Sequence, residues 1–131
     1  MKRSGETWRR WVPRADIPPR LYVHSVFDTG EALKWTLEEE TGDRLLDIMF
    51  NEKPAVYAST DEMFLLQMPE MAEPFPWPFH TVTNSRLMES FDGEADHVLG
   101  SAKYVHLVVS AADYILDFLV IELPQVEWRT T

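Results

Sequence analysis

The sequence predicts an α+β domain in which a mostly antiparallel sheet of about six strands carries two short helices. Three observations indicate this fold class: two stretches have the pattern of β-hairpins, two further apolar segments are short enough for single strands, and two helix-start signals stand between the hairpins. With 131 residues, of which 45% are apolar, the chain is long enough for one domain around a single core. The expected strands are 21–27, 32–39, 44–50, 54–58, 103–110 and 113–122, and the expected helices are 60–68 and 84–91.

Residues 1–20 are expected to form a basic arm ahead of a single α+β domain at 21–131. The arm holds six of the twelve basic residues of the chain and only two acidic ones. Trp8 and Trp11 stand among its arginines, and three prolines near its end argue against a continuing helix. The segment is therefore either a mobile arm or a strap that lies over the domain.

The first hairpin signal covers residues 32–50. With Thr41 and Gly42 as the loop, each residue i faces residue 83 − i. This register matches apolar residues with each other and sets Glu39 opposite Arg44 as a surface ion pair. The apolar pairs are Leu37 with Leu46, Trp35 with Ile48 and Leu33 with Phe50.

Two helix starts are visible in the middle of the chain. Ser59 and Glu62 have the spacing of a capping box ahead of an apolar run, which predicts a helix over 60–68 that ends before Pro69. A second helix over 84–91 follows a short extended piece at 79–82, with Asn84 or Ser85 as its cap. Between them, residues 69–79 alternate proline with aromatic residues, which is typical of a stiff, extended segment.

The longest apolar run, 103–123, predicts the second hairpin, with a turn within residues 110–113. In this hairpin residue i is expected to face residue 223 − i, which pairs Leu107 with Leu116 and His106 with Asp117. The two ionisable side chains would then hydrogen-bond across the hairpin.

His106 and Asp117 are the weak candidates for a catalytic pair, because a carboxylate can orient an imidazole that acts as a general base. No nucleophile is evident beside them, so a buried polar pair that fixes the hairpin register is the preferred interpretation. The enzyme alternative predicts that His106 lies at the wall of a pocket. The chain has no cysteine, no metal-binding histidine spacing and no glycine-rich phosphate loop, so neither a metal nor a cofactor is expected.

Charge indicates a different kind of function. Residues 1–20 carry +4 and residues 21–131 carry −14, which together give the net charge of −10. So acidic a domain repels nucleic acid and anionic membranes and attracts basic proteins. We therefore expect a cytoplasmic protein that binds a basic partner, because no apolar stretch reaches membrane-spanning length and no signal peptide is evident. The candidate partner-binding residues are Glu38, Glu39, Glu40, Asp43, Asp92, Glu94 and Asp96, with Trp77 as an aromatic anchor.

The alternative is a homodimer or larger homo-oligomer that associates through the proline–aromatic segment or the arm. That interpretation predicts a two-fold interface that buries aromatic residues instead of acidic ones.

The stretches VYASTDE, FHTVTNSRLMESF and YVHLVVSAADYILDFLV resemble a loose group of small uncharacterised bacterial proteins. Several of those proteins resemble members of toxin-immunity and contact-inhibition gene neighbourhoods. The resemblance implies a cytosolic protein that binds and blocks one toxin, such as a basic nuclease-type toxin domain. The shared positions, which this resemblance marks as structural, are Phe79, Val82, Asn84, Ser85, Phe91, His106, Asp113 and Asp117.

Overall fold

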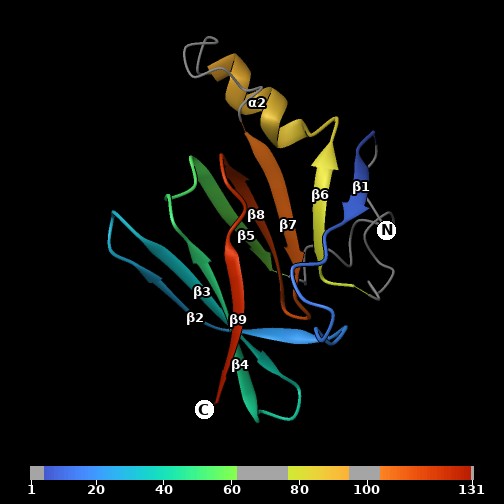
Figure 1. Cartoon of the computed structure of the whole chain (residues 1–131). Coiled ribbons are helices and arrows are strands. Elements are labelled where there is room, and N and C mark those ends of the chain that lie inside the picture. Colours follow the sequence, from blue (N-terminus) through green and yellow to red (C-terminus); the bar gives the residue numbers. More distant parts are fainter. Residues whose placement is uncertain (1–4, 62–76, 95–103, 131) are drawn as a thin grey trace.

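The computed structural model describes residues 5–61, 77–94 and 104–130. In this part of the chain nine strands form two antiparallel sheets, and a single helix lies beyond the ends of β6 and β7 (Figure 1). The strands are β1 (Thr7–Arg10), β2 (Leu21–Asp28), β3 (Leu33–Glu39), β4 (Arg44–Phe50), β5 (Val56–Asp61), β6 (Phe79–Thr83), β7 (Val105–Ser110), β8 (Tyr114–Val120) and β9 (Gln125–Thr130), and the helix is α2 (Arg86–Glu94).

The two sheets pack face to face around one core. The five-stranded sheet has the order β1-β6-β7-β8-β5, and the four-stranded sheet has the order β2-β3-β4-β9. Phe118 on β8 contacts both Trp35 on β3 and Phe50 on β4, with ring centroids 6.1 and 4.7 Å apart. The core residues stand at alternate positions of their strands, such as Leu116, Phe118 and Val120 of β8, so they share the face that each sheet turns toward the other.

The expected α+β class is wrong, because the described chain consists mainly of strands in two sheets instead of one sheet with two helices. Two strands were missed. The basic arm supplies β1, which pairs with β6 at the edge of the five-stranded sheet. The C-terminal residues supply β9, which pairs with β4 and places Val126 in the core. Both strands are short, and their partners lie far away in the sequence, so local patterns indicate them weakly.

The helix expected at 60–68 does not begin where the capping box predicts. Ser59, Thr60 and Asp61 belong to β5 and pair with β8, at the edge of the five-stranded sheet. Six successive residue pairs join these two strands, so strand pairing outweighs the local helix-start signal. The rest of that expected helix, from residue 62 onward, lies outside the described residues.

The other expected elements are present. The six strands expected at 21–27, 32–39, 44–50, 54–58, 103–110 and 113–122 correspond to β2, β3, β4, β5, β7 and β8, although residue 103 lies outside the described part. The short extended piece expected at 79–82 is the strand β6. The helix expected at 84–91 is α2. No helix among the described residues is long and apolar enough to span a membrane.

The register of the first hairpin is confirmed. Leu33 pairs with Phe50, Trp35 with Ile48, and Leu37 with Leu46. Gly42 in its loop has a φ of 78°, a left-handed conformation that favours glycine. The expected ion pair is also present, since the guanidinium of Arg44 donates two hydrogen bonds, of 3.0 and 2.8 Å, to the carboxylate of Glu39.

The register of the second hairpin is wrong by two residues. Leu107 pairs with Phe118 instead of Leu116, and His106 pairs with Leu119 instead of Asp117. The turn lies one residue later than expected, with the amide of Ala111 donating to the carbonyl of Tyr114. Contacts with β2 hold it there, because the amide of Ala112 donates to the carbonyl of Leu21 and the carboxylate of Asp113 accepts the amide of Val23.

Candidate functional site

A buried chain of hydrogen bonds joins a hydroxyl, an imidazole and a carboxylate on the outer face of the five-stranded sheet. Ser85 Oγ lies 2.6 Å from Nδ1 of His106, and Nε2 of His106 lies 2.7 Å from Oδ1 of Asp117. The three residues are 7%, 0% and 5% exposed. When the imidazole is neutral, Nε2–H donates to the carboxylate and the serine hydroxyl donates to Nδ1.

Strand pairing explains how His106 and Asp117 meet despite the shifted register. A shift of two residues keeps every side chain on the same face of the sheet, because side chains alternate with a period of two. The two residues are therefore diagonal neighbours on β7 and β8 instead of direct partners. The predicted hydrogen bond between His106 and Asp117 is confirmed. Their predicted position directly opposite each other on the two strands is not.

The sharp connection between β6 and α2 places Ser85 next to His106. Asn84 has a φ of 56°, so the chain turns abruptly between the strand and the helix. Ser85 then caps the helix, because its Oγ accepts the amide of Met88 at 2.9 Å. The buried carboxylate of Glu6 accepts a second free amide, that of Arg86, at 2.9 Å.

The sequence identified Ser85 as a possible helix cap but not as a partner of His106. The two residues are 21 positions apart and belong to different elements, so no spacing rule connects them. Only the pairing of β6 with β7, in which Val82 lies opposite His106, brings the start of α2 to the imidazole.

Serine, histidine and aspartate in this order have the chemical types of a nucleophilic triad. Their burial argues against that activity, because His106 is 0% exposed and the hydroxyl of Ser85 already serves as a helix cap. A substrate carbonyl would have to approach the Oγ atom from a side that is open, and Ser85 is only 7% exposed. The network instead ties α2 to β7 and β8.

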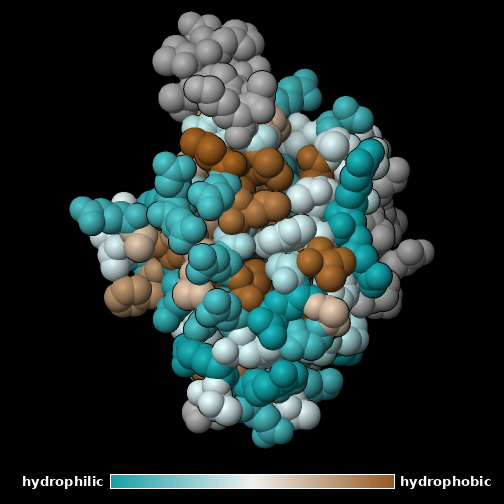
Figure 2. Space-filling model, in the orientation of Figure 1, coloured by the Kyte–Doolittle hydropathy of each residue, from teal (hydrophilic) through white to brown (hydrophobic). Residues whose placement is uncertain are grey.

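Four acidic candidates lie together at the end of the β3–β4 hairpin: Glu38, Glu39, Glu40 and Asp43. Glu40 and Asp43 are exposed, whereas Glu38 and Glu39 are half-buried. The two hydrogen bonds from Arg44 hold the pKa of Glu39 below its usual value. This end of the molecule therefore presents a mixture of charges, and the face seen in Figure 2 is mostly hydrophilic there, at the bottom of the view.

The other acidic candidates lie elsewhere. Asp92 and Glu94 belong to the last turn of α2, which has no basic residue, and Asp96 lies outside the described residues. The helix and the turn between β3 and β4 are at opposite ends of the molecule (Figure 1). The described candidates therefore lie in two separate acidic regions. We call them the hairpin end (Glu38, Glu39, Glu40, Asp43) and the helix end (Asp92 and Glu94, together with Glu89 of the same helix, which was not among the candidates).

Trp77 is not a surface anchor. It is only 8% exposed, its indole N–H donates to the carbonyl of Trp11 at 2.7 Å, and the guanidinium of Arg10 lies 4.7 Å from its ring centre. This side chain holds the N-terminal segment on the core, so it contributes to the fold and not to a binding surface.

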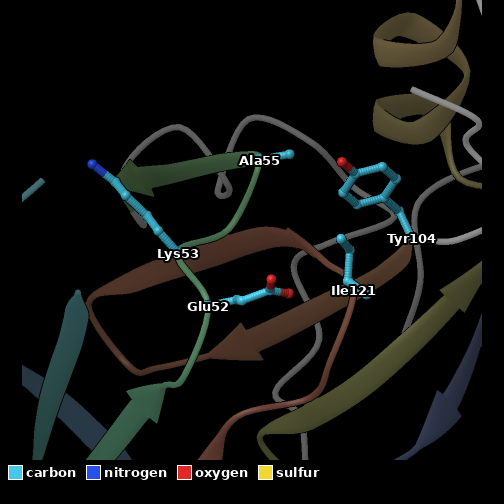
Figure 3. Close-up of a pocket in the computed structure, with 5 residues that line it drawn as sticks. All are labelled: Glu52, Lys53, Ala55, Tyr104 and Ile121. Carbon is cyan, nitrogen blue, oxygen red and sulfur yellow. The ribbon is translucent and has the colours of Figure 1, made fainter. Parts of the chain in front are cut away.

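A pocket of about 250 Å³ opens near the helix end (Figure 3). The loop between β4 and β5 contributes Glu52, Lys53 and Ala55, Tyr104 precedes β7, and Ile121 follows β8. Ile121 is 53% exposed, so its apolar side chain is accessible from solvent. The sequence did not single out these residues, since they come from three separate loops and share no pattern.

No group of three or more potential metal ligands is found among residues 5–61, 77–94 and 104–130. Comparisons with protein-family models, with curated proteins and with solved structures find no significant match to the chain. The charge, the pocket and the buried network are therefore the features of this protein that bear on its function.

Proposed function

We propose that the chain is a small acidic protein that binds a basic protein partner. Its specific form, which follows from the resemblance of the sequence, is an immunity protein that neutralises a basic, nuclease-type toxin. The observation that carries the proposal is the charge of −14 on residues 21–131.

Ion pairs within the chain remove basic charge from the surface. Arg44 pairs with Glu39, Lys53 with Asp28 and Arg129 with Asp47, at distances of 2.6 to 3.0 Å. These pairs engage three of the six basic residues in the domain, and each pair cancels one acidic charge. With the four excess basic charges of residues 1–20 included, the folded chain still has a net charge of −10, which is left for solvent or for a partner.

The helix end is the better binding region of the two. At the hairpin end Arg44 stands among the carboxylates and is stacked over Trp128, 3.9 Å from the ring centre. In α2, by contrast, the acidic residues extend into the last turn, where the helix dipole disfavours negative charge. Acidic residues at an unfavourable position are better explained by a partner than by helix stability.

The homo-oligomer alternative gains no comparable support. It requires exposed aromatic residues in the proline–aromatic segment or the arm. Among the described residues of these segments, Trp77 and Phe79 are buried in the core, and Trp8 and Trp11 pack against buried clusters. Residues 69–76 of the proline–aromatic segment lie outside the described part of the chain.

The test begins with affinity capture from the native cytosol at low ionic strength, followed by identification and purification of the captured protein. Its association and dissociation rates are then measured between 50 and 500 mM salt. We expect the association rate to fall at least about tenfold, because charge complementarity acts mainly on diffusional encounter, while the dissociation rate changes less. Expression of the captured protein alone should arrest growth, and co-expression of this chain should relieve the arrest.

Two charge-reversal variants provide the matched comparison. Glu89→Lys, Asp92→Lys and Glu94→Lys together reverse the helix end, and Glu38→Lys, Glu40→Lys and Asp43→Lys reverse the hairpin end. The helix-end variant should lose most of the association rate and the protection of growth, and the hairpin-end variant should lose less. If no basic protein binds, or if both variants protect cells as the wild type does, the proposal is wrong.

A further inference from the structure

The pocket near the helix end contains a free carboxylate beside an apolar wall. Figure 3 shows the carboxylate of Glu52 directed toward Ile121, and the hydroxyl of Tyr104 directed toward Ala55. Within the described part of the chain, Glu52 makes no hydrogen bond or ion pair. The pocket therefore offers one negative charge, one hydroxyl and two apolar contacts to a ligand.

Lys53 does not neutralise this carboxylate, although it lines the same pocket. Its side chain points away from Glu52 in Figure 3, and its ammonium lies 3.0 Å from the carboxylate of Asp28. Asp28 also accepts hydrogen bonds from Tyr57 at 2.7 Å and from the amide of Gly30 at 2.8 Å. These hydrogen bonds lower the pKa of Asp28 to about 2, so it remains charged and keeps Lys53 engaged.

We propose that this pocket binds an arginine side chain of the basic partner. A guanidinium is planar, pairs with a carboxylate through two parallel hydrogen bonds and stacks on aromatic rings. Glu52 is the acceptor, Tyr104 supplies the ring and hydroxyl, and Ile121 and Ala55 contact the aliphatic part of the arginine. A volume of about 250 Å³ is below the range of about 300–1,000 Å³ that is usual for small-molecule sites, and it suits a single side chain.

A contact with α2 links the pocket to the acidic helix end. The ring of Phe91 packs edge-to-face on the ring of Tyr104, with centroids 5.3 Å apart. Asp92 follows Phe91 directly, so a partner that inserts an arginine next to Tyr104 also approaches the acidic last turn of the helix. The inference rests on the proposed function, because it names the residue through which the basic partner docks.

The test uses the isolated protein and a small probe, which makes it independent of the partner. N-acetyl-L-arginine amide is titrated into isotope-labelled protein while the methyl resonances of Ala55 and Ile121 and the ring resonances of Tyr104 are recorded. N-acetyl-L-citrulline amide is the neutral control of nearly the same shape. We expect saturable shifts at these three residues with the arginine probe and at least about threefold weaker binding of the citrulline probe, which cannot form the charged pair.

Two substitutions that remove the same charge separate the pocket from general acidity. Glu52→Gln should weaken binding of the arginine probe about threefold to tenfold, because one solvent-accessible ion pair is lost. Glu127→Gln, at an exposed position of β9 outside the pocket and both acidic regions, should leave the affinity unchanged. Equal affinity for both probes, or the same affinity in Glu52→Gln as in the wild type, overturns the inference.

The outcomes also distinguish this inference from the proposed function. If the arginine probe binds but no basic partner is found in the cytosol, the arginine site in the pocket is supported and the proposed function is contradicted. A basic partner that binds Glu52→Gln and the wild type equally well supports the function and overturns the pocket.

Discussion

The hydroxyl oxygen of Ser85 lies 2.6 Å from Nδ1 of His106 and 2.9 Å from the amide nitrogen of Met88. One small side chain therefore caps α2 and also anchors it to the five-stranded sheet. Nε2 of His106 in turn lies 2.7 Å from Oδ1 of Asp117, so a continuous chain of hydrogen bonds runs from the helix through β7 to β8. Because the path is buried, its members are satisfied by each other and not by water.

Replacement of Ser85 by alanine should destabilise the protein by about 1–3 kcal/mol, because it removes a helix cap and a buried hydrogen bond together. The free energy of unfolding from urea titrations measures the effect. Ser90→Ala is the control, since Ser90 is exposed on the same helix and alanine is the better helix former. Equal stability of the two variants would show that the Ser85 contacts contribute nothing.

Replacement of Asp117 by alanine should destabilise the protein by about 3–5 kcal/mol, because the imidazole of His106 loses its acceptor in a buried site. The double variant Ser85→Ala and Asp117→Ala should lose less than the sum of the single losses, since both residues act through His106. A double-mutant cycle in urea measures this coupling. Strict additivity of the two losses would mean that the residues do not form one network.

Much of the fold could be predicted from local pattern, and the limits of such prediction have physical causes. The β3–β4 hairpin was predicted in the correct register, because three apolar pairs and a glycine turn specify the same alignment. The β7–β8 register was missed by two residues, because contacts of Ala112 and Asp113 with β2 fix that turn. Such contacts lie about ninety residues apart in the sequence and leave no local pattern.

The candidate site was predictable only in part for the same reason. His106 and Asp117 lie on the same face of adjacent strands, so they are neighbours both in the predicted register and in the observed one, which differs by two residues. Ser85 joins them through the pairing of β6 with β7, and Glu52, Tyr104 and Ile121 meet at a junction of loops. The acidic charge follows directly from the composition. The composition could not show that the candidate acidic residues divide between two ends of the molecule.

Replacement of Asp47 by asparagine should reduce the acid sensitivity of the protein. Burial of Asp47 opposes its ionisation, but hydrogen bonds from Arg129 at 2.6 Å and from Thr36 at 2.7 Å outweigh burial and lower its pKa. A carboxylate with a lowered folded pKa contributes stability that is present above the unfolded pKa of about 3.9 and is lost as the pH falls toward the folded value.

The measurement for Asp47 is the free energy of unfolding between pH 2.5 and 6. The asparagine variant should be less stable than the wild type at pH 6, and the difference between them should shrink as the pH falls below about 4. Asp43→Asn, in the exposed hairpin turn, is the control and should follow the wild type. A constant difference across the range would contradict this linkage.

The protein should also lose stability between pH 6.5 and 4 because of His80. Burial of this half-buried imidazole, with a further contribution from the nearby Arg10 guanidinium, lowers its pKa from 6.5 to about 4. The folded protein keeps His80 neutral in that interval while the unfolded chain takes up a proton, so stability is full above about pH 6.5 and declines as the pH falls toward 4. His80→Gln cannot be protonated, so its stability should decline less over the same interval.

The matched control for His80 is His24→Gln, because His24 is exposed on β2 and forms its side-chain hydrogen bond with Ser25 at the surface. A titration of the His80 ring protons by NMR should give a midpoint near pH 4, and urea unfolding from pH 4 to 7 should show a smaller slope for His80→Gln than for the wild type and His24→Gln. If the three slopes coincide, or if His80 titrates near pH 6.5, the imidazole is not held neutral by its surroundings. The packing of its ring against Trp8, with centroids 5.7 Å apart, would then have to be loose enough to admit water.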